Sequence, residues 1–227
     1  MTMNGKAEEI DKTYKKYMGK SPKSQKSPGS PGQTLRKNKG EAVMPKEYLS
    51  LVGQSMFYST KIAPECAFTN GQLARHMQNP GKEYWKAMDC FVGYIKGKKE
   101  HKLIMKNPTE LRMISYYDLS YGDCKDTQRS TMGEAHTIGG SITSWRSQWQ
   151  KIVTQWSSET EYVVTLLEVA EEQKFTQILL EEIAEVDMPG YIYGGNEASI
   201  FLAKNKHVSN RTKHIGIREH FIRECVN

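Results

Sequence analysis

The sequence has 227 residues, of which 37% are hydrophobic and 26% charged, with a mean hydropathy of −0.66 and a net charge of +6. This length allows one sizeable core, or one domain with a smaller appendage. Because no apolar run approaches the roughly 18 residues of a membrane span, and the first residues lack the apolar stretch of a signal peptide, we expect no membrane association and an intracellular protein, in the cytoplasm or nucleus.

The positive charge is concentrated at the start of the chain. Residues 1–40 hold ten Lys and Arg against three Asp and Glu. Residues 20–39 are rich in Ser, Pro, Gly and Lys and offer little to bury, which is typical of disorder. We therefore expect residues 1–43 to form a disordered basic tail. Such a tail is either a solvated linker or a non-specific contact to phosphate backbones, and the sequence leaves both open.

A small helical segment is predicted over residues 44–107. Three stretches in it carry apolar residues at helical spacing, namely 48–58, 66–77 and 82–96. In the third stretch one stripe collects Trp85, Met88, Val92 and Ile95. A stripe of this kind is by default the face that packs into a core.

Extended segments dominate the next part of the chain. An apolar run ends in Asp118, and Gly139-Gly140 joins two short strands, which is a strong hairpin signal. Residues 150–156 continue the extended pattern. The sequence to this point predicts three antiparallel strands.

Helix formers follow from about Glu159 until Pro189-Gly190 stops the pattern, and residues 191–195 read as a short strand. A further helix is expected over residues 196–205, and residues 209–226 are expected to form a basic loop and a last helix. The order of elements predicts an α/β (α+β) fold, with a mixed five-stranded sheet flanked by helices.

Several motifs give the chain a specific resemblance. They occur in one order and spacing, as YLSLVGQSMFY at 48–58, NPGKEYWKAMDCFVGYIKG at 79–97, DLSYG at 118–122, SSETEY at 157–162 and RTKHIGIREHFIRE at 211–224. With them, residues 48–224 resemble the C-terminal part of a copia-type LTR retrotransposon Pol polyprotein. The resemblance implies that residues 44–107 are the end of a reverse transcriptase region. Residues 108–227 would then be an RNase H domain, with the RNase H-like fold.

The resemblance also implies a metal site. RNase H enzymes cut the RNA strand of an RNA–DNA hybrid with two Mg²⁺ ions, which Mn²⁺ can replace, about 3.5–4 Å apart and held by carboxylate oxygens. Matched by motif, Asp118 in DLSYG and Glu159 in SSETEY correspond to the first two metal-binding carboxylates. The third and fourth acids of the family are replaced here by Gly195 and Gly216. We therefore expect weakened metal binding and impaired catalysis.

The basic C-terminal stretch carries the remaining candidate residues. His214 matches a position where related nucleases place a histidine near the scissile phosphate, but it can equally be a residue at a helix start. A candidate nucleic-acid-binding face consists of Arg211, Lys213, Arg218 and Arg223. That face would lie along a nucleic-acid backbone or be merely solvated, and both interpretations stay open.

The sequence thus favours a fragment of a retrotransposon polyprotein with an impaired RNase H-like domain that retains binding to RNA–DNA hybrid or other nucleic acid. One alternative is an active metal-dependent ribonuclease H, in which Glu197 or Glu219 completes the site. A second alternative is a non-catalytic interaction or scaffold module that binds no nucleic acid.

Overall fold

The computed structural model describes residues 4–30, 35–100, 102–108, 110–150 and 158–195. The chain divides into two compact units. Unit 1 consists of Met1–Ile104 with Cys124–Gln128 and Arg146–Gln148, and unit 2 of the remaining residues from Met105 to Asn227. Within the described ranges, no helix is long and apolar enough to cross a membrane.

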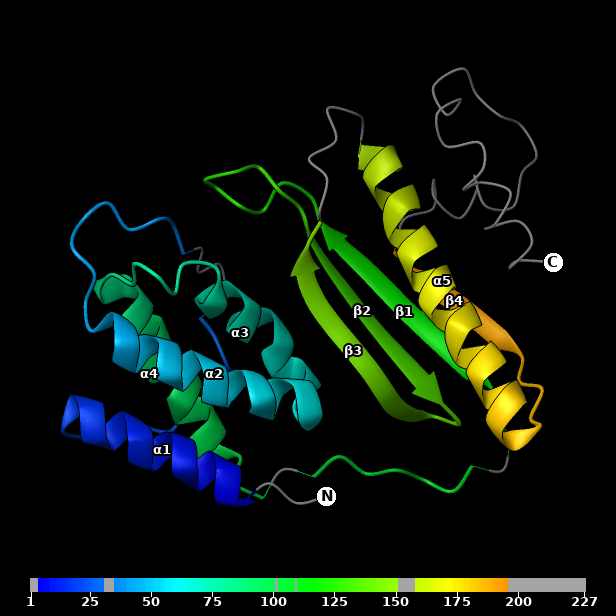
Figure 1. Cartoon of the computed structure of the whole chain (residues 1–227), viewed down its shortest axis with the longest axis horizontal. Coiled ribbons are helices and arrows are strands. Elements are labelled where there is room, and N and C mark those ends of the chain that lie inside the picture. Colours follow the sequence, from blue (N-terminus) through cyan, green and yellow to red (C-terminus); the bar gives the residue numbers. More distant parts are fainter. Residues whose placement is uncertain (1–3, 31–34, 101, 109, 151–157, 196–227) are drawn as a thin grey trace. The chain divides into compact units, whose positions relative to one another are not determined.

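Unit 1 is a helical bundle (Figure 1). Its elements are α1 (Asn4–Met18), α2 (Pro45–Lys61), the short 3-10 helix η1 (Pro64–Cys66), α3 (Ala67–Ala74) and α4 (Lys82–Gly97). The predicted stripe of α4 is confirmed, because Trp85, Met88, Val92 and Ile95 are all buried in one hydrophobic core. The helices predicted over residues 48–58, 66–77 and 82–96 correspond to α2, α3 with η1, and α4.

The expectation of disorder over residues 1–43 is wrong for α1. This helix places Ala7, Ile10 and Tyr14 in the core of unit 1, at positions i, i+3 and i+7. The Tyr14 hydroxyl donates a hydrogen bond of 2.7 Å to Asp89 Oδ1 on α4. The lysines of α1 concealed this apolar stripe, because they raise the average polarity of the segment without occupying its inward face.

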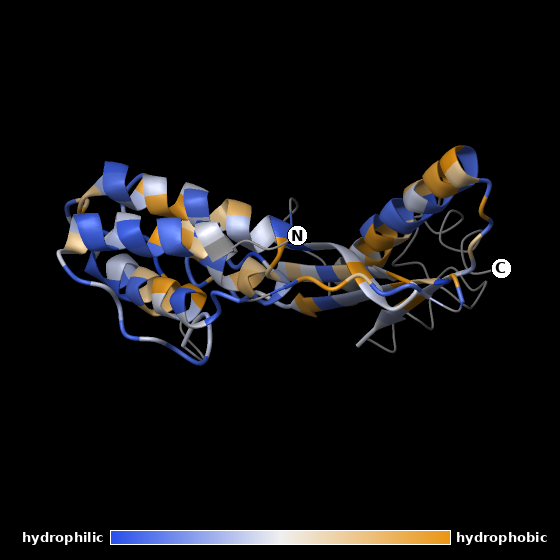
Figure 2. Ribbon diagram, turned by 90° about the horizontal axis from the view of Figure 1, so that it is seen from below, coloured by the Kyte–Doolittle hydropathy of each residue, from blue (hydrophilic) through white to orange (hydrophobic). Residues whose placement is uncertain are grey.

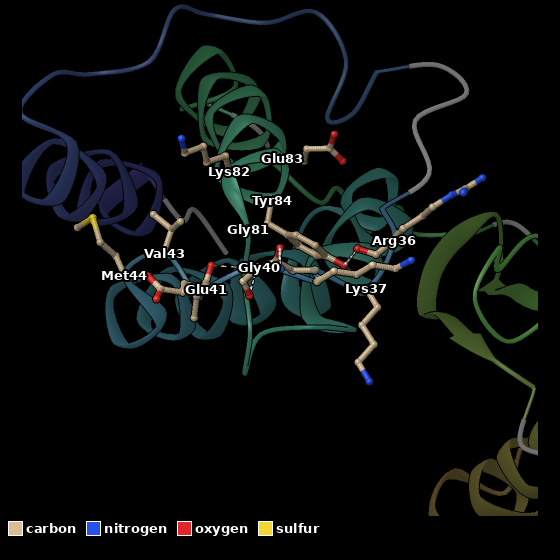
Figure 3. A pocket seen from close by; sticks show the side chains of 13 residues that line it. Arg36, Lys37, Gly40, Glu41, Val43, Met44, Gly81, Lys82, Glu83 and Tyr84 are labelled. Atoms are coloured by element: carbon tan, nitrogen blue, oxygen red, sulfur yellow. Dashed lines mark hydrogen bonds between the residues drawn. The ribbon is translucent and has the colours of Figure 1, made fainter.

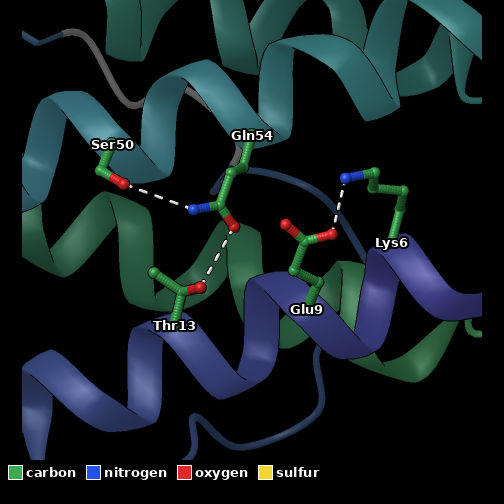
Figure 4. A network of polar contacts seen from close by, with 5 residues as sticks. All are labelled: Lys6, Glu9, Thr13, Ser50 and Gln54. Atoms are coloured by element: carbon green, nitrogen blue, oxygen red, sulfur yellow. Dashed lines mark hydrogen bonds and ion pairs between the residues drawn. The ribbon is translucent and has the colours of Figure 1, made fainter.

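A polar network also fixes α1 to α2 (Figure 4). Thr13 Oγ1 donates to Gln54 Oε1 at 3.2 Å, and Gln54 Nε2 donates to Ser50 Oγ at 3.3 Å. On the exposed side of α1, Lys6 Nζ and Glu9 Oε2 lie 2.6 Å apart. An exposed pair of this kind contributes at most about 1 kcal/mol, so the buried stripe rather than the ion pair holds the helix.

The segment between α1 and α2 is held at several points as well. Gln25 N donates to Gly93 O at 3.2 Å, and Tyr84 Oη donates to Arg36 O at 3.1 Å. Leu35 is buried in the same core. The Ser/Pro/Lys-rich composition therefore did not prevent this segment from packing onto α4.

Unit 2 is built on a mixed four-stranded sheet in the order β3-β2-β1-β4. Its elements are β1 (Met113–Ser120), β2 (Thr131–Ile138), β3 (Ser141–Trp149), α5 (Ser158–Ala184) and β4 (Gly190–Gly194). Strand β1 pairs with β2 in antiparallel and with β4 in parallel fashion. The mixed α/β class is as predicted, although the described residues contain four strands rather than five.

The predicted hairpin is confirmed. Gly139 and Gly140 join β2 to β3 with φ angles of +56° and +75°. Two consecutive residues with positive φ are the requirement of a two-residue type I′ hairpin turn, whose twist matches that of the strands.

Helix α5 lies against β1 and β4. It buries Leu166, Leu167, Val169 and Ala170 beneath the sheet, whereas its later turns leave Phe175, Ile178, Leu179 and Ile183 exposed. Figure 2 shows these hydrophobic turns continuing towards the end of the helix. Burial of the first half fixes how the start of α5 meets the sheet.

Candidate active site at the ends of β1 and β4

Asp118 lies on the open face of the sheet. Burial alternates along β1. The buried residues are Met113, Ser115, Tyr117 and Leu119, and the residues between them are more exposed. Asp118 is in the exposed set, third from the end of the strand. Strand β1 therefore runs two residues beyond the predicted end, and the carboxylate reaches solvent on the face opposite to α5.

Gly195 lies beside Asp118. The parallel register pairs Tyr117 with Gly194, so the next residues along the two strands, Asp118 and Gly195, are neighbours. A Cβ atom added at Gly195 would lie 3.8 Å from Asp118 Oδ1, and no other described atom lies within 4 Å of it. An aspartate side chain at this position would therefore stand next to the carboxylate of Asp118.

The two glycines of this strand end differ in what they permit. The ring of Tyr117 occupies the place where a Cβ atom of Gly194 would lie, and Tyr117 is only 4% exposed. Gly194 is therefore required by packing. Among the described atoms, a Cβ atom at Gly195 would meet only Asp118 Oδ1, in ordinary van der Waals contact, and Gly195 does not have the positive φ that would favour glycine. Local packing thus explains the glycine at 194 but not the glycine at 195.

Glu159 is the second residue of α5, which begins at Ser158, one residue before the predicted start. The structure describes the helix here but not the side chains of residues 158–163. Further along, Gln150 Nε2 donates to Thr165 Oγ1 at 2.8 Å, and this buried bond ties the end of β3 to α5. The position of Glu159 in the chain is therefore described, whereas its distance to Asp118 is not.

The other predicted site residues lie outside the described residues. They are Gly216, His214, Arg211, Lys213, Arg218 and Arg223, together with the alternative acids Glu197 and Glu219. Their roles remain predictions.

The described residues do not by themselves fit Mg²⁺. Hard cations require several oxygen ligands, and in the described part of the chain no three His, Cys, Asp or Glu residues gather in a group that could hold a metal ion. A nearby acid, Asp123, is engaged by the Thr131 hydroxyl, which lies 2.7 Å from Oδ1 and 2.8 Å from Oδ2. We derive no chemical step through a metal from this arrangement.

A buried polar contact beneath the sheet was not singled out from the sequence. Ser115 Oγ lies 2.8 Å from His136 Nδ1, and Glu134 Oε1 lies 4.0 Å from His136 Nε2. The β1–β2 register places Ser115 directly opposite His136, and both are at most 1% exposed. Such burial closes these groups to a substrate, so we interpret the contact as structural. The alternating pattern of the two strands was the signal that could have revealed it.

Comparison with known proteins finds relatives of this chain among transposon polyproteins. The retrovirus-related Pol polyprotein from transposon TNT 1-94 of Nicotiana tabacum is 31% identical over 180 residues, which are 79% of this chain and 13% of that protein. The corresponding polyprotein from transposon RE2 of Arabidopsis thaliana is 30% identical over 182 residues, 80% of this chain and 12% of that protein. No family model matches the chain.

Among solved structures, the foamy viral protease-reverse transcriptase in complex with dsDNA aligns with 87% of this chain and 40% of that chain, at 14% identity. Its TM-score of 0.28 is too low to support an argument about the fold. In sequence, the chain is similar to retrovirus-related Pol polyproteins of transposons, and it spans 12–13% of the length of the two relatives above.

Proposed function

We propose that unit 2 is an RNase H-like domain of a transposon Pol polyprotein whose metal site is incomplete, so that catalysis is impaired while binding to RNA–DNA hybrid or other nucleic acid is retained. The observation that carries this proposal is the position of Gly195. Its missing side chain would point at Asp118, the one family carboxylate whose surroundings are described. A family acid at that position would complete a pair of carboxylates near the ends of β1 and β4.

The loss of catalytic rate is expected to be large because the chemistry depends on two metal ions. In a complete site of this kind, two Mg²⁺ or Mn²⁺ ions would supply activation of water and stabilisation of the leaving oxygen. Asp118 and Glu159 would hold these ions, and Gly195 and Gly216 contribute neither a ligand oxygen nor a compensating negative charge. Cleavage should therefore be slower by orders of magnitude than with four carboxylates.

The test is cleavage of a labelled RNA–DNA hybrid in Mg²⁺ and in Mn²⁺. The unmodified chain is compared with the double variant Gly195→Asp/Gly216→Asp. Ser144→Asp is the matched control, because it adds a carboxylate at an exposed position of β3, a strand that does not neighbour β1. We expect cleavage only with the double variant.

Two other results would overturn the proposal. If the unmodified chain cuts the hybrid and Glu159→Gln abolishes cutting, the chain is an active ribonuclease H whose ligands we have misassigned. If the double variant does not cut and the unmodified chain shows no salt-dependent binding to hybrid, an interaction module without nucleic acid becomes the better interpretation.

A further inference from the structure

The later turns of α5 expose an apolar stripe to solvent. We propose that this stripe is the docking surface of residues 209–226, which we call the basic segment, and that the basic segment packs on it as an amphipathic helix of the same chain. This contact goes beyond the function proposed above. It is also independent of that function, because it uses neither Asp118 nor a metal ion.

The α5 stripe consists of four large apolar residues, namely Phe175, Ile178, Leu179 and Ile183. Their exposed fractions lie between 40% for Leu179 and 73% for Ile183. The four residues recur at positions i, i+3, i+4 and i+8, so they share one side of the helix, and Figure 2 shows this hydrophobic character continuing to the helix end. Single exposed apolar residues are ordinary, whereas a contiguous row of them marks an interaction surface.

The α5 stripe points away from the sheet. Gln173 is buried, and its side chain occupies the place where a Cβ atom of Gly190 would lie on β4. Gln177 Nε2 donates to Met188 O at 2.7 Å, next to the start of that strand. Phe175 is two residues from each of these glutamines, and two residues turn an α-helix by about 200°. The sheet therefore covers the opposite side of α5 and leaves the stripe for another partner.

The surroundings of the α5 stripe are acidic. Residues 171–185 hold five Glu against one Lys, a net charge of −4. Glu171 lies one turn before Phe175 and Glu182 one turn after Ile178, and both glutamates are exposed. None of the ion pairs found in the described part of the chain includes them. A partner that combines apolar residues with positive charge would match this surface, whereas a second copy of it would bring glutamates against glutamates.

The basic segment has the complementary composition. It lies outside the described residues, and its sequence holds four Lys and Arg against two Glu, a net charge of +2. In the predicted helix, Ile217, Phe221 and Ile222 form the apolar side. Packing that side on the α5 stripe would bury apolar surface of both, and this burial would contribute more than the exposed ion pairs around it. The charges would select the partner and its orientation.

The chain is long enough for this contact. Strand β4 ends at Gly194 and lies against α5. Residues 195–214 can span up to about 66 Å, whereas the 27 residues of α5 extend over only about 40 Å. Every part of the α5 stripe is therefore within reach of the basic segment. Because the two are joined in one chain, the segment has an advantage over a separate partner of equal affinity.

The other basic stretch of the chain, residues 20–39, is already engaged within unit 1. Gln25 N donates to Gly93 O at 3.2 Å. Tyr84 Oη donates to Arg36 O at 3.1 Å (Figure 3). Docking of this stretch on α5 would require such bonds to break. The basic segment is therefore the better occupant of the α5 stripe.

The test measures hydrogen exchange of the full chain without nucleic acid, in peptides that cover the basic segment. The stripe variant is Phe175→Ser/Ile183→Ser. The matched control is Leu49→Ser/Phe57→Ser, which replaces two exposed apolar residues of α2. We expect the basic segment to exchange at least about tenfold faster in the stripe variant than in the unmodified chain, and at an unchanged rate in the control.

A charge exchange tests the same contact while leaving the α5 stripe intact. Glu171→Lys/Glu182→Lys and Arg218→Glu/Arg223→Glu should each speed exchange of the basic segment, because each places like charges opposite one another. Combining the two double variants should restore the protection. Restoration would not occur if the substitutions merely weakened the two helices.

Equal exchange of the basic segment in the unmodified chain and the stripe variant would overturn the proposal. So would a combined charge variant that is no better protected than its two parents. If light scattering shows a dimer that only the stripe variant loses, while exchange of the basic segment is unchanged, the occupant is a second copy and the proposal fails. Unchanged exchange in peptides of β1 checks that the sheet stays folded, and the charge variants decide the question if the stripe variant unfolds.

Discussion

Replacing Gly194 by alanine is expected to destabilise the sheet edge, whereas the same change at Gly195 is expected to be tolerated. The Cβ atom at 194 would overlap the ring of Tyr117, which is almost fully buried and has no free space to enter. Overpacking of this kind costs about 1–3 kcal/mol. At Gly195 the new Cβ atom meets only Asp118 Oδ1 at 3.8 Å, and alanine there could stabilise the fold by about 0.4–1 kcal/mol through a less flexible unfolded chain.

The two variants can be compared directly, because the glycines are adjacent and the added group is the same. Hydrogen exchange of peptides that cover β1 and β4 reports the free energy of opening of this edge without requiring the two units to unfold together. We expect Gly194→Ala to exchange at least about fivefold faster than Gly195→Ala, which corresponds to a difference of about 1 kcal/mol. Equal protection in the two variants would refute the close approach of Tyr117 to Gly194 and, with it, the placement of Gly195 beside Asp118.

Three further predictions concern buried polar groups. Tyr14→Phe removes the hydrogen bond to Asp89 and should cost about 1–3 kcal/mol, measured as faster hydrogen exchange in α1 with no change in β1. Ser115→Ala removes the bond to buried His136 and should lower the free energy of unfolding of unit 2 by about 1–3 kcal/mol in a urea titration; an unchanged midpoint would contradict the contact. Burial, with smaller contributions from neighbouring acidic groups, raises the pKa of Tyr58 from 10.0 to about 12, so folding favours its neutral phenol. The neutral phenol of Tyr58 therefore contributes its full stabilisation below pH 10, and this stabilisation is lost as the pH rises from 10 towards 12. The variant Tyr58→Phe should make the alkaline decline in melting temperature less steep.

Much of the architecture could be predicted from periodicity. The stripe of α4, the Gly139-Gly140 hairpin and the long helix that begins near Glu159 are all encoded by local spacing, and each is found at the expected place. These patterns are readable because a helix or strand repeats its inward face every 3.6 or two residues, whatever surrounds it.

The start of the chain was misjudged for a physical reason. Average composition describes residues 1–43 as a basic tail, but folding depends on which residues share a face. Ala7, Ile10 and Tyr14 form such a face on α1, and the core of unit 1 supplies the surface that it covers. A helix of 15 residues with this charge would be marginal alone, so the contact with α2 and α4 decides whether it forms.

For the candidate site, too, some features could be predicted from the sequence and others depended on the tertiary structure. The sequence by itself predicted Asp118 and Glu159 as site residues by motif and showed that glycines stand at positions 195 and 216. Only the tertiary structure decided that Gly195 lies beside Asp118, because that proximity arises from the parallel pairing of two strands that are more than 70 residues apart in sequence. Only the structure, likewise, distinguished Gly194, which the ring of Tyr117 requires, from Gly195, which no described neighbour requires. Motif matching reads residue identity along the chain, whereas the space around each residue is set by contacts that the chain makes when it folds.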